Sequence, residues 1–289
     1  MPTVAMMRQY LLCTMLLMLA AQVSQPVYAQ VTLGQFTIGR DLFLAQFDSK
    51  TDVDDLHSVA GVATMLRSPA FAGVDYHAVA GAYGIQEGLY VPAPRLFERA
   101  FGPHWSDAHQ HREQALEEVA NRVASTLAGG GHVWVAEAGQ SDFTADWLRR
   151  VREMDIPVST TEHVHVVQHS EWNESVTSAD KLSFVREFAD YRHIPDGNVA
   201  GNGTPGLRVE NAGLWDAVLA APRVAELWRL ARVGAMKFNG FEGRYDNAAI
   251  AAGGMDFSDV AETCWIFGYA DIPDAEAFFS LFLQPQASQ

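Results

Sequence analysis

The feature that most constrains this chain is an apolar run, residues 42–47, that passes directly into an acidic turn. A run of this length is typical of a buried strand, and the apolar spacing after the turn predicts a helix. The turn carries one ammonium and four carboxylates, from Lys50, Asp48, Asp52, Asp54 and Asp55. Carboxylates this close together repel one another unless a cation, a proton or a polyhydroxy ligand balances them. Because α/β sheets place their chemistry at strand-to-helix turns, we expect a functional site here.

Strand and helix patterns alternate along the chain, which predicts an α/β protein with a mainly parallel sheet flanked by helices, a Rossmann-like fold. The expected strands span residues 42–47, 76–82, 132–136, 157–158 and 163–168. The expected helices span residues 54–67, 110–128, 178–191, 214–220, 224–233, 257–269 and 274–283, with a further helix through residues 147–151. Residues 195–206 are too rich in Gly, Pro and Asn for a regular element, so we expect an ordered surface loop there that can line a site.

The first residues are typical of a signal peptide, residues 1–29. Arg8 precedes an apolar run, residues 10–21, that is too short for a membrane span, and Val27-Tyr28-Ala29 supplies a small-residue cleavage pattern. We therefore expect residues 30–289 to form a single exported domain, periplasmic or secreted, with no membrane contact after cleavage. Cys264 is then the remaining cysteine, which excludes an intramolecular disulfide.

Composition narrows the class of ligand. The formal net charge of −15 disfavours nucleic acid polymers and anionic membrane surfaces, but it is compatible with a small neutral ligand. The spacings G-x-S-x-G and H-E-x-x-H and the P-loop pattern are absent from the sequence, which argues against serine-esterase, zinc-protease and nucleoside-triphosphate sites. The oligomeric state stays open, and a homo-oligomer is compatible with the sequence.

Four segments, in order, resemble the nucleoside hydrolase superfamily. The turn Asp48-x-Lys50-x-x-x-Asp54-Asp55 resembles that family's signature, a strand followed by D-x-D-x-x-x-D-D. Residues 132–139 resemble the strand before its glycine-containing turn, and Glu171-Trp172-Asn173 is similar to its E-F-N triplet. Asp259 stands at the place of a late metal-binding aspartate. The resemblance covers residues 42–269 and is that of a divergent member.

This resemblance implies an enzyme that hydrolyses N-ribosyl bonds. In the family, calcium holds a water and two ribose hydroxyls, and a carboxylate deprotonates the water that attacks the anomeric carbon. Carried over, the family pattern makes Asp55 and Asp259 calcium ligands, with a backbone carbonyl from Asp142. Asp54 and Asn173 would contact ribose hydroxyls, and Glu171 would contact the terminal hydroxyl. Oxygen ligands of this kind suit calcium, and carboxylate and amide groups suit vicinal diols.

The main departure is Lys50, which stands where the family has an acid that is both metal ligand and presumed base. An ammonium among these aspartates can replace calcium as the local positive charge, which leaves Asp48 or Asp55 to activate water. His169 is a candidate leaving-group acid because its ordinary pKa suits proton transfer near neutrality. Trp172 is a candidate for stacking on a sugar or base.

The leading hypothesis is an exported glycosidase of the nucleoside hydrolase type, with a small sugar or nucleoside as substrate and calcium as a possible cofactor. One alternative is a sugar-binding protein that has lost catalysis. Another is a metal-free hydrolase of a carbohydrate other than a nucleoside.

Overall fold

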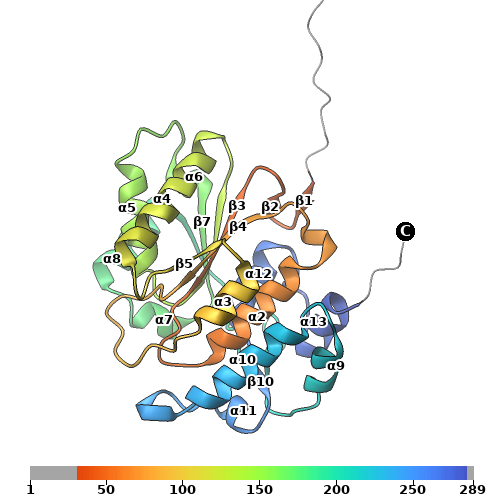
Figure 1. Ribbon diagram of the computed structural model, residues 1–289. Coiled ribbons are helices and arrows are strands. Elements are labelled where there is room, and N and C mark those ends of the chain that lie inside the picture. The colour runs from red at the N-terminus through yellow and green to blue at the C-terminus, as the bar shows by residue number, and fades with distance from the viewer. Residues whose placement is uncertain (1–30, 285–289) are drawn as a thin grey trace, which may run out of the picture. The chain divides into compact units, whose positions relative to one another are not determined.

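A parallel sheet organises residues 31–284, the part of the chain that the computed structural model describes (Figure 1). Its six strands lie in the order β5-β4-β3-β6-β7-β8, and every neighbouring pair is parallel. The strands are β3 Leu42–Phe47, β4 Asp75–Ala80, β5 Trp105–Asp107, β6 Val133–Ala138, β7 Val164–Gln168 and β8 Asp190–His193. The predicted α/β fold with a mainly parallel, Rossmann-like sheet is therefore confirmed.

Helices cover both faces of this sheet, as Figure 1 shows. One face packs against α4 Arg112–Ala128, α5 Asp142–Arg152 and α8 Ala179–Phe188. The other packs against α2 Asp54–Leu66, α3 Pro94–Phe101, α9 Trp215–Ala220, α10 Ala225–Phe238, α12 Val260–Ile266 and α13 Ala275–Phe282. Short elements complete the described chain: β1 Thr32–Leu33, β2 Phe36–Thr37, η1 Pro69–Phe71, α6 Thr160–His163, α7 Glu171–Ser175, β9 Arg208–Val209, η2 Phe241–Gly243, α11 Ala248–Ala251 and β10 Met255–Asp256.

The central strand β3 shows why the sheet needs both layers. Its six residues are all buried, and alternate side chains point to opposite faces of a strand. Leu42 and Leu44 belong to the core under α4 and α5, whereas Phe43 and Phe47 belong to the core under α2 and α3. A parallel strand covered in this way reads as a continuous apolar run, which is the pattern in the sequence.

Edge strands and boundaries differ from the sequence prediction. Pro157 and Val158 lie in a bend and not in a strand. The helix expected over residues 178–191 ends at Phe188, and Tyr191 lies in β8 at the sheet edge. Edge strands are exposed on one side, so β8, with its half-buried and exposed residues, lacks the apolar run that marks β3.

The described residues form one compact unit, and the expected signal peptide lies outside them. Between residues 31 and 284, no helix combines the length and the apolar character needed to cross a bilayer. Cys264 is buried in this unit as a free thiol on α12.

The aromatic core beside α10 gives a test of this packing. Phe257 is fully buried and packs edge-on against Trp228 and Phe278, with ring centroids 5.5 and 5.2 Å away. We expect Phe257→Ala to lower the free energy of unfolding by about 3–5 kcal/mol, because it removes buried area and leaves a cavity. Urea denaturation measures this. Phe241→Ala, at a ring that is 51% exposed, is the matched control and should change stability by less than ~1 kcal/mol. Equal losses in both variants would contradict this packing.

Candidate functional site

A cavity of about 440 Å³ opens where three neighbouring strands end. Asp48 follows β3, Gly139 follows β6 and His169 follows β7, and all three line it. The carboxyl edge of a parallel sheet is the usual ligand site of such folds, and this volume suits a small molecule. The polar and charged residues that line it are Asp48, Lys50, Thr51, Asp52, Asp54, Asp55, His169, Ser170, Asn173, Asp196, Asn198, Arg208, Asp256, Ser258 and Asp259.

Most of the residues singled out from the sequence meet at this cavity. Eight of them line it: Asp48, Lys50, Asp54, Asp55, His169, Trp172, Asn173 and Asp259. Two do not. Glu171 is exposed in the first turn of α7 and is not part of the lining. The carboxylate of Asp142 is fully buried elsewhere, where it accepts hydrogen bonds from the Ser178 backbone N–H (3.1 Å) and hydroxyl (2.5 Å).

Lys50 makes no close ion pair with the acids of its own turn. Its ammonium donates to the Gln86 carbonyl oxygen at 2.5 Å and lies 4.2 Å from the centroid of the Tyr83 ring. Within residues 31–284, no carboxylate oxygen lies within the 4.0 Å that defines an ion pair with this nitrogen. Burial, opposed by the charge of Asp48, lowers the pKa of Lys50. Its charge therefore acts on Asp48 without a direct ion pair.

Asp48 and Asp55 form a close carboxyl pair. Asp48 accepts from the Lys50 backbone N–H at 2.8 Å and from the Gln140 amide at 2.7 Å, while Asp55 accepts from the Ser49 backbone N–H. Burial raises the pKa of Asp48 to about 6, against the opposing effect of its contact with Asp55. Burial and the charge of Asp48 raise the pKa of Asp55 well above its usual range. Their shared hydrogen bond lowers the pKa of Asp48 and raises that of Asp55, so Asp55 is the member that carries a proton shared by the pair.

Gly139 is required by the position of Asp48. Phe47 and Ala138 are partners in the β3–β6 register, so the residues that follow them, Asp48 and Gly139, lie side by side. Gly139 has φ +144°, and a Cβ there would stand 2.6 Å from the Asp48 Cβ. A larger residue would displace the acid, because real Cβ contacts do not become this short.

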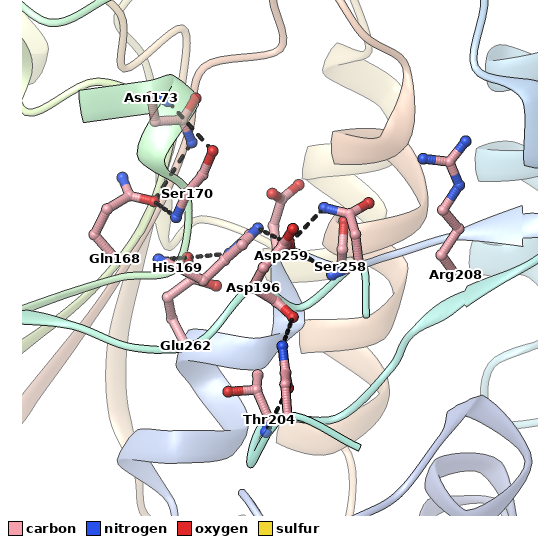
Figure 2. A network of polar contacts seen from close by, with 12 residues as sticks. Gln168, His169, Ser170, Asn173, Asp196, Thr204, Arg208, Ser258, Asp259 and Glu262 are labelled. Atoms are coloured by element: carbon pink, nitrogen blue, oxygen red, sulfur yellow. Dashed lines mark hydrogen bonds and ion pairs between the residues drawn. The ribbon is translucent and has the colours of Figure 1, made fainter. Parts of the chain in front are cut away.

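His169 supplies a buried positive charge. It is 2% exposed, and its Nδ1 lies 2.6 Å from a carboxylate oxygen of Glu262, which is fully buried on α12 (Figure 2). Burial lowers the pKa of His169, but the Glu262 carboxylate outweighs this and raises it to about 9. Its Nε2 lies 4.0 Å from Asp196 at the cavity. His169 is thus an imidazolium at neutral pH.

Asp52 of the acidic turn and Asp256, which the sequence did not single out, form a second acidic group at the cavity. The side-chain amide of Asn247 donates to Asp256 at 2.8 Å and to both oxygens of Asp52 at 3.3 and 3.4 Å. The Asn247 oxygen caps α11 by accepting from two backbone N–H groups. Arg208 lies 3.7 Å from Asp256. Burial, with the charge of Asp256, raises the pKa of Asp52 to about 6.

Sequence patterns could not have linked Asp52 to Asp256 and Asn247, because the link depends on tertiary contacts of a segment without apolar periodicity. The loop of residues 195–206 was correctly expected to line a site, through Asp196 and Asn198. Asn202 braces that loop by donating to the Asp196 carbonyl at 2.7 Å, and Thr204 in turn binds Asn202 (Figure 2).

The His169–Glu262 pair predicts how stability depends on pH. Because the folded-state pKa of His169 lies above its ordinary value near 6.5, the pair stabilises the fold fully below about pH 6.5, and this contribution is lost as pH rises through about 9. Glu262→Gln should lower the pKa of His169, because it removes the negative charge that opposes the effect of burial. NMR titration of the imidazole measures this. Glu174→Gln, which removes the carboxylate 3.1 Å from His193, is the matched control and should leave His169 unchanged. An unchanged pKa in Glu262→Gln would contradict the assignment.

Comparison of the chain with protein-family models, with curated proteins and with solved structures finds no match. The likeness to nucleoside hydrolases therefore rests on the residues themselves.

Proposed function

We propose that this protein is an exported hydrolase of N-ribosyl or related glycosidic bonds and a divergent member of the nucleoside hydrolase superfamily. The observation that carries the proposal is the Asp48–Asp55 pair in a cavity at the carboxyl edge of the sheet. Two carboxyl groups whose environments separate their pKa values are the usual arrangement for acid and base work in glycoside hydrolysis.

Asp48 is the base in this proposal. An ionised carboxylate with a pKa of about 6 can accept a proton from water near neutral pH. The water oxygen then bonds to the anomeric carbon as the bond to the leaving group breaks, through an oxocarbenium-like state. Asp55 donates the proton of their shared hydrogen bond in this proposal, which leaves Asp48 as the member of the pair that can act as the base.

Other polar residues of the cavity can contact the sugar. Asp54 and Asn173 line the cavity, and Asp259 joins them from the start of α12, where it accepts from the Ser58 hydroxyl at 3.1 Å. Carboxylate and amide groups can accept and donate to vicinal hydroxyls. Trp172 is 53% exposed at the mouth and offers a ring for stacking.

His169 fits the role of proton donor to a leaving group. Its Nδ1 contacts Glu262, which leaves Nε2–H available at the cavity, 4.0 Å from the carboxylate of Asp196. A donor whose pKa lies above the working pH stays protonated until the leaving group develops a negative charge.

The described residues fall short of the calcium site that the family pattern implies. Asp55 and Asp259 bring carboxylates to the cavity, and Asp55 Oδ1 is buried without a hydrogen-bond partner. Lys50 replaces a third carboxylate, and Asp142 is not part of the cavity lining. Among residues 31–284, no three His, Cys, Asp or Glu side chains are grouped as metal ligands. Calcium takes six to eight oxygens, so this donor set does not fit it and the proposed reaction has no step that uses it.

One observation favours a second candidate, a non-catalytic sugar-binding protein. Both oxygens of Asp48 already accept hydrogen bonds, from Lys50 and Gln140, which weakens a carboxylate as a base. A binding protein would need the same hydroxyl contacts but no free base.

The hydrolase proposal predicts that Asp48→Asn lowers kcat by on the order of 10²–10⁴-fold, because it removes the base and keeps the shape of the side chain. A panel of nucleosides, assayed for release of reducing sugar, measures this, and calorimetry measures binding. Asp216→Asn, exposed on α9, is the matched control and should retain full activity. If the native protein binds panel members without cleaving them, the sugar-binding candidate replaces the hydrolase.

The donor set predicts that chelation leaves the reaction unchanged. We expect dialysis against EDTA to alter kcat by less than about twofold, because the described carboxylates do not make a calcium cage. The same assay with calcium restored is the control. Activity that disappears with EDTA and returns with calcium would show that a metal completes the site.

A further inference from the structure

The cavity holds more carboxyl groups than its own cations pair with. Five of its carboxylates make no ion pair with any residue between 31 and 284: Asp48, Asp52, Asp54, Asp55 and Asp259. Each cation near them is engaged elsewhere. The Lys50 ammonium binds a carbonyl, Arg208 pairs with Asp256, and His169 pairs with Glu262.

Asp52 is the member of this group with the most freedom to meet a ligand. It is half-buried, and its carboxylate contacts the backbone N–H groups of Val53 (2.6 Å) and Asp54 and the neutral amide of Asn247, with no cation among them. The long Asn247 contacts leave lone pairs on both oxygens. A carboxylate placed this way attracts a positive charge at the cavity.

Two exposed aromatic side chains line the same cavity. Trp172 and Tyr245 are each 53% exposed, although large aromatic rings at a surface are usually packed. They come from distant parts of the chain, α7 and the segment before α11. Aromatic faces attract cations and stack on flat rings, so an acidic cavity that they line suits a flat, positively charged ring.

We propose that the substrate is a sugar whose leaving group is an aromatic cation, such as an N-ribosylpyridinium. This inference rests on the proposed function and narrows its substrate class. The ring would meet Trp172 or Tyr245, its positive charge would meet Asp52, and the sugar hydroxyls would meet Asp54 and Asn173.

The chemistry of such a bond suits this site. When the C–N bond breaks, its electron pair goes to the ring nitrogen, so the pyridinium leaves as a neutral pyridine and needs no proton. Water adds its oxygen to the anomeric carbon and gives one proton to Asp48, which releases it to solvent. The products are the free sugar, the neutral base and one proton. The positive charge thus disappears from the leaving group as the reaction proceeds, and product release is favoured because the attraction to Asp52 is lost.

The test compares N-ribosylnicotinamide, a pyridinium cation, with uncharged uridine on the same protein. We expect kcat/KM to be at least tenfold higher for the cation. Asp52→Asn should lower kcat/KM for the cation by about tenfold, the effect of a single interaction of ~1.4 kcal/mol, and should change that for uridine by less than twofold. Glu187→Gln, exposed on α8, removes the same net charge outside the cavity and is the matched control.

Three results would overturn the inference while the proposed function stands: equal rates on both substrates, a preference for uridine, or an Asp52→Asn effect of the same size on both. If neither compound is cleaved, the proposed function fails and calorimetry with the same two compounds decides the inference. Tighter binding of the cation that weakens in Asp52→Asn and in Trp172→Leu supports it, and equal or tighter binding of uridine overturns it.

Discussion

The constraint on which the rest of this structure depends is the removal of several carboxylates from water at one edge of a parallel sheet. Burial disfavours the charged form of each acid and raises the pKa of Asp48 to about 6. At Asp52 and Asp259 the charges of neighbouring acids add to burial, and the pKa values rise to about 6 and about 8. Because the net stability of a fold is small, it can accept this cost only if the buried acids are confined to one place. Here the acids gather at strand ends and helix starts, next to backbone N–H groups that offset part of it.

The core of the fold could be predicted because its signal is local. The run at residues 42–47 is buried on both faces, and the stripe of Leu116, Val119 and Val123 on α4 packs on one of them. The edge strands were harder. β8 begins at Asp190 with residues that face solvent in part, and its strand geometry comes from pairing with β7 and not from its own pattern.

The site could be predicted only in part, for a related reason. Asp48, Asp54 and Asp55 share one turn, so sequence proximity brought them together. Which partner each acid contacts depends on the tertiary structure. Proximity in sequence suggested that Lys50 neutralises its neighbours, whereas the side chain reaches Gln86, thirty-six positions away, and the Tyr83 ring. Glu262, which sets the charge of His169, lies ninety-three positions from it and carries no motif that would link the two.

Asn247 fixes the direction of the hydrogen bonds to two acids of the cavity. Its amide oxygen is used by the first turn of α11, so the opposite end, the NH₂ group, must point at Asp52 and Asp256. A primary amide is nearly symmetric in shape, and in an open pocket it could rotate to offer either end to a ligand. The helix start removes that choice. Behind the cavity lining, Asn247 is therefore a fixed donor to Asp52. A group that competes for Asp52 does so against a hydrogen bond whose polarity cannot be reversed without breaking the start of α11.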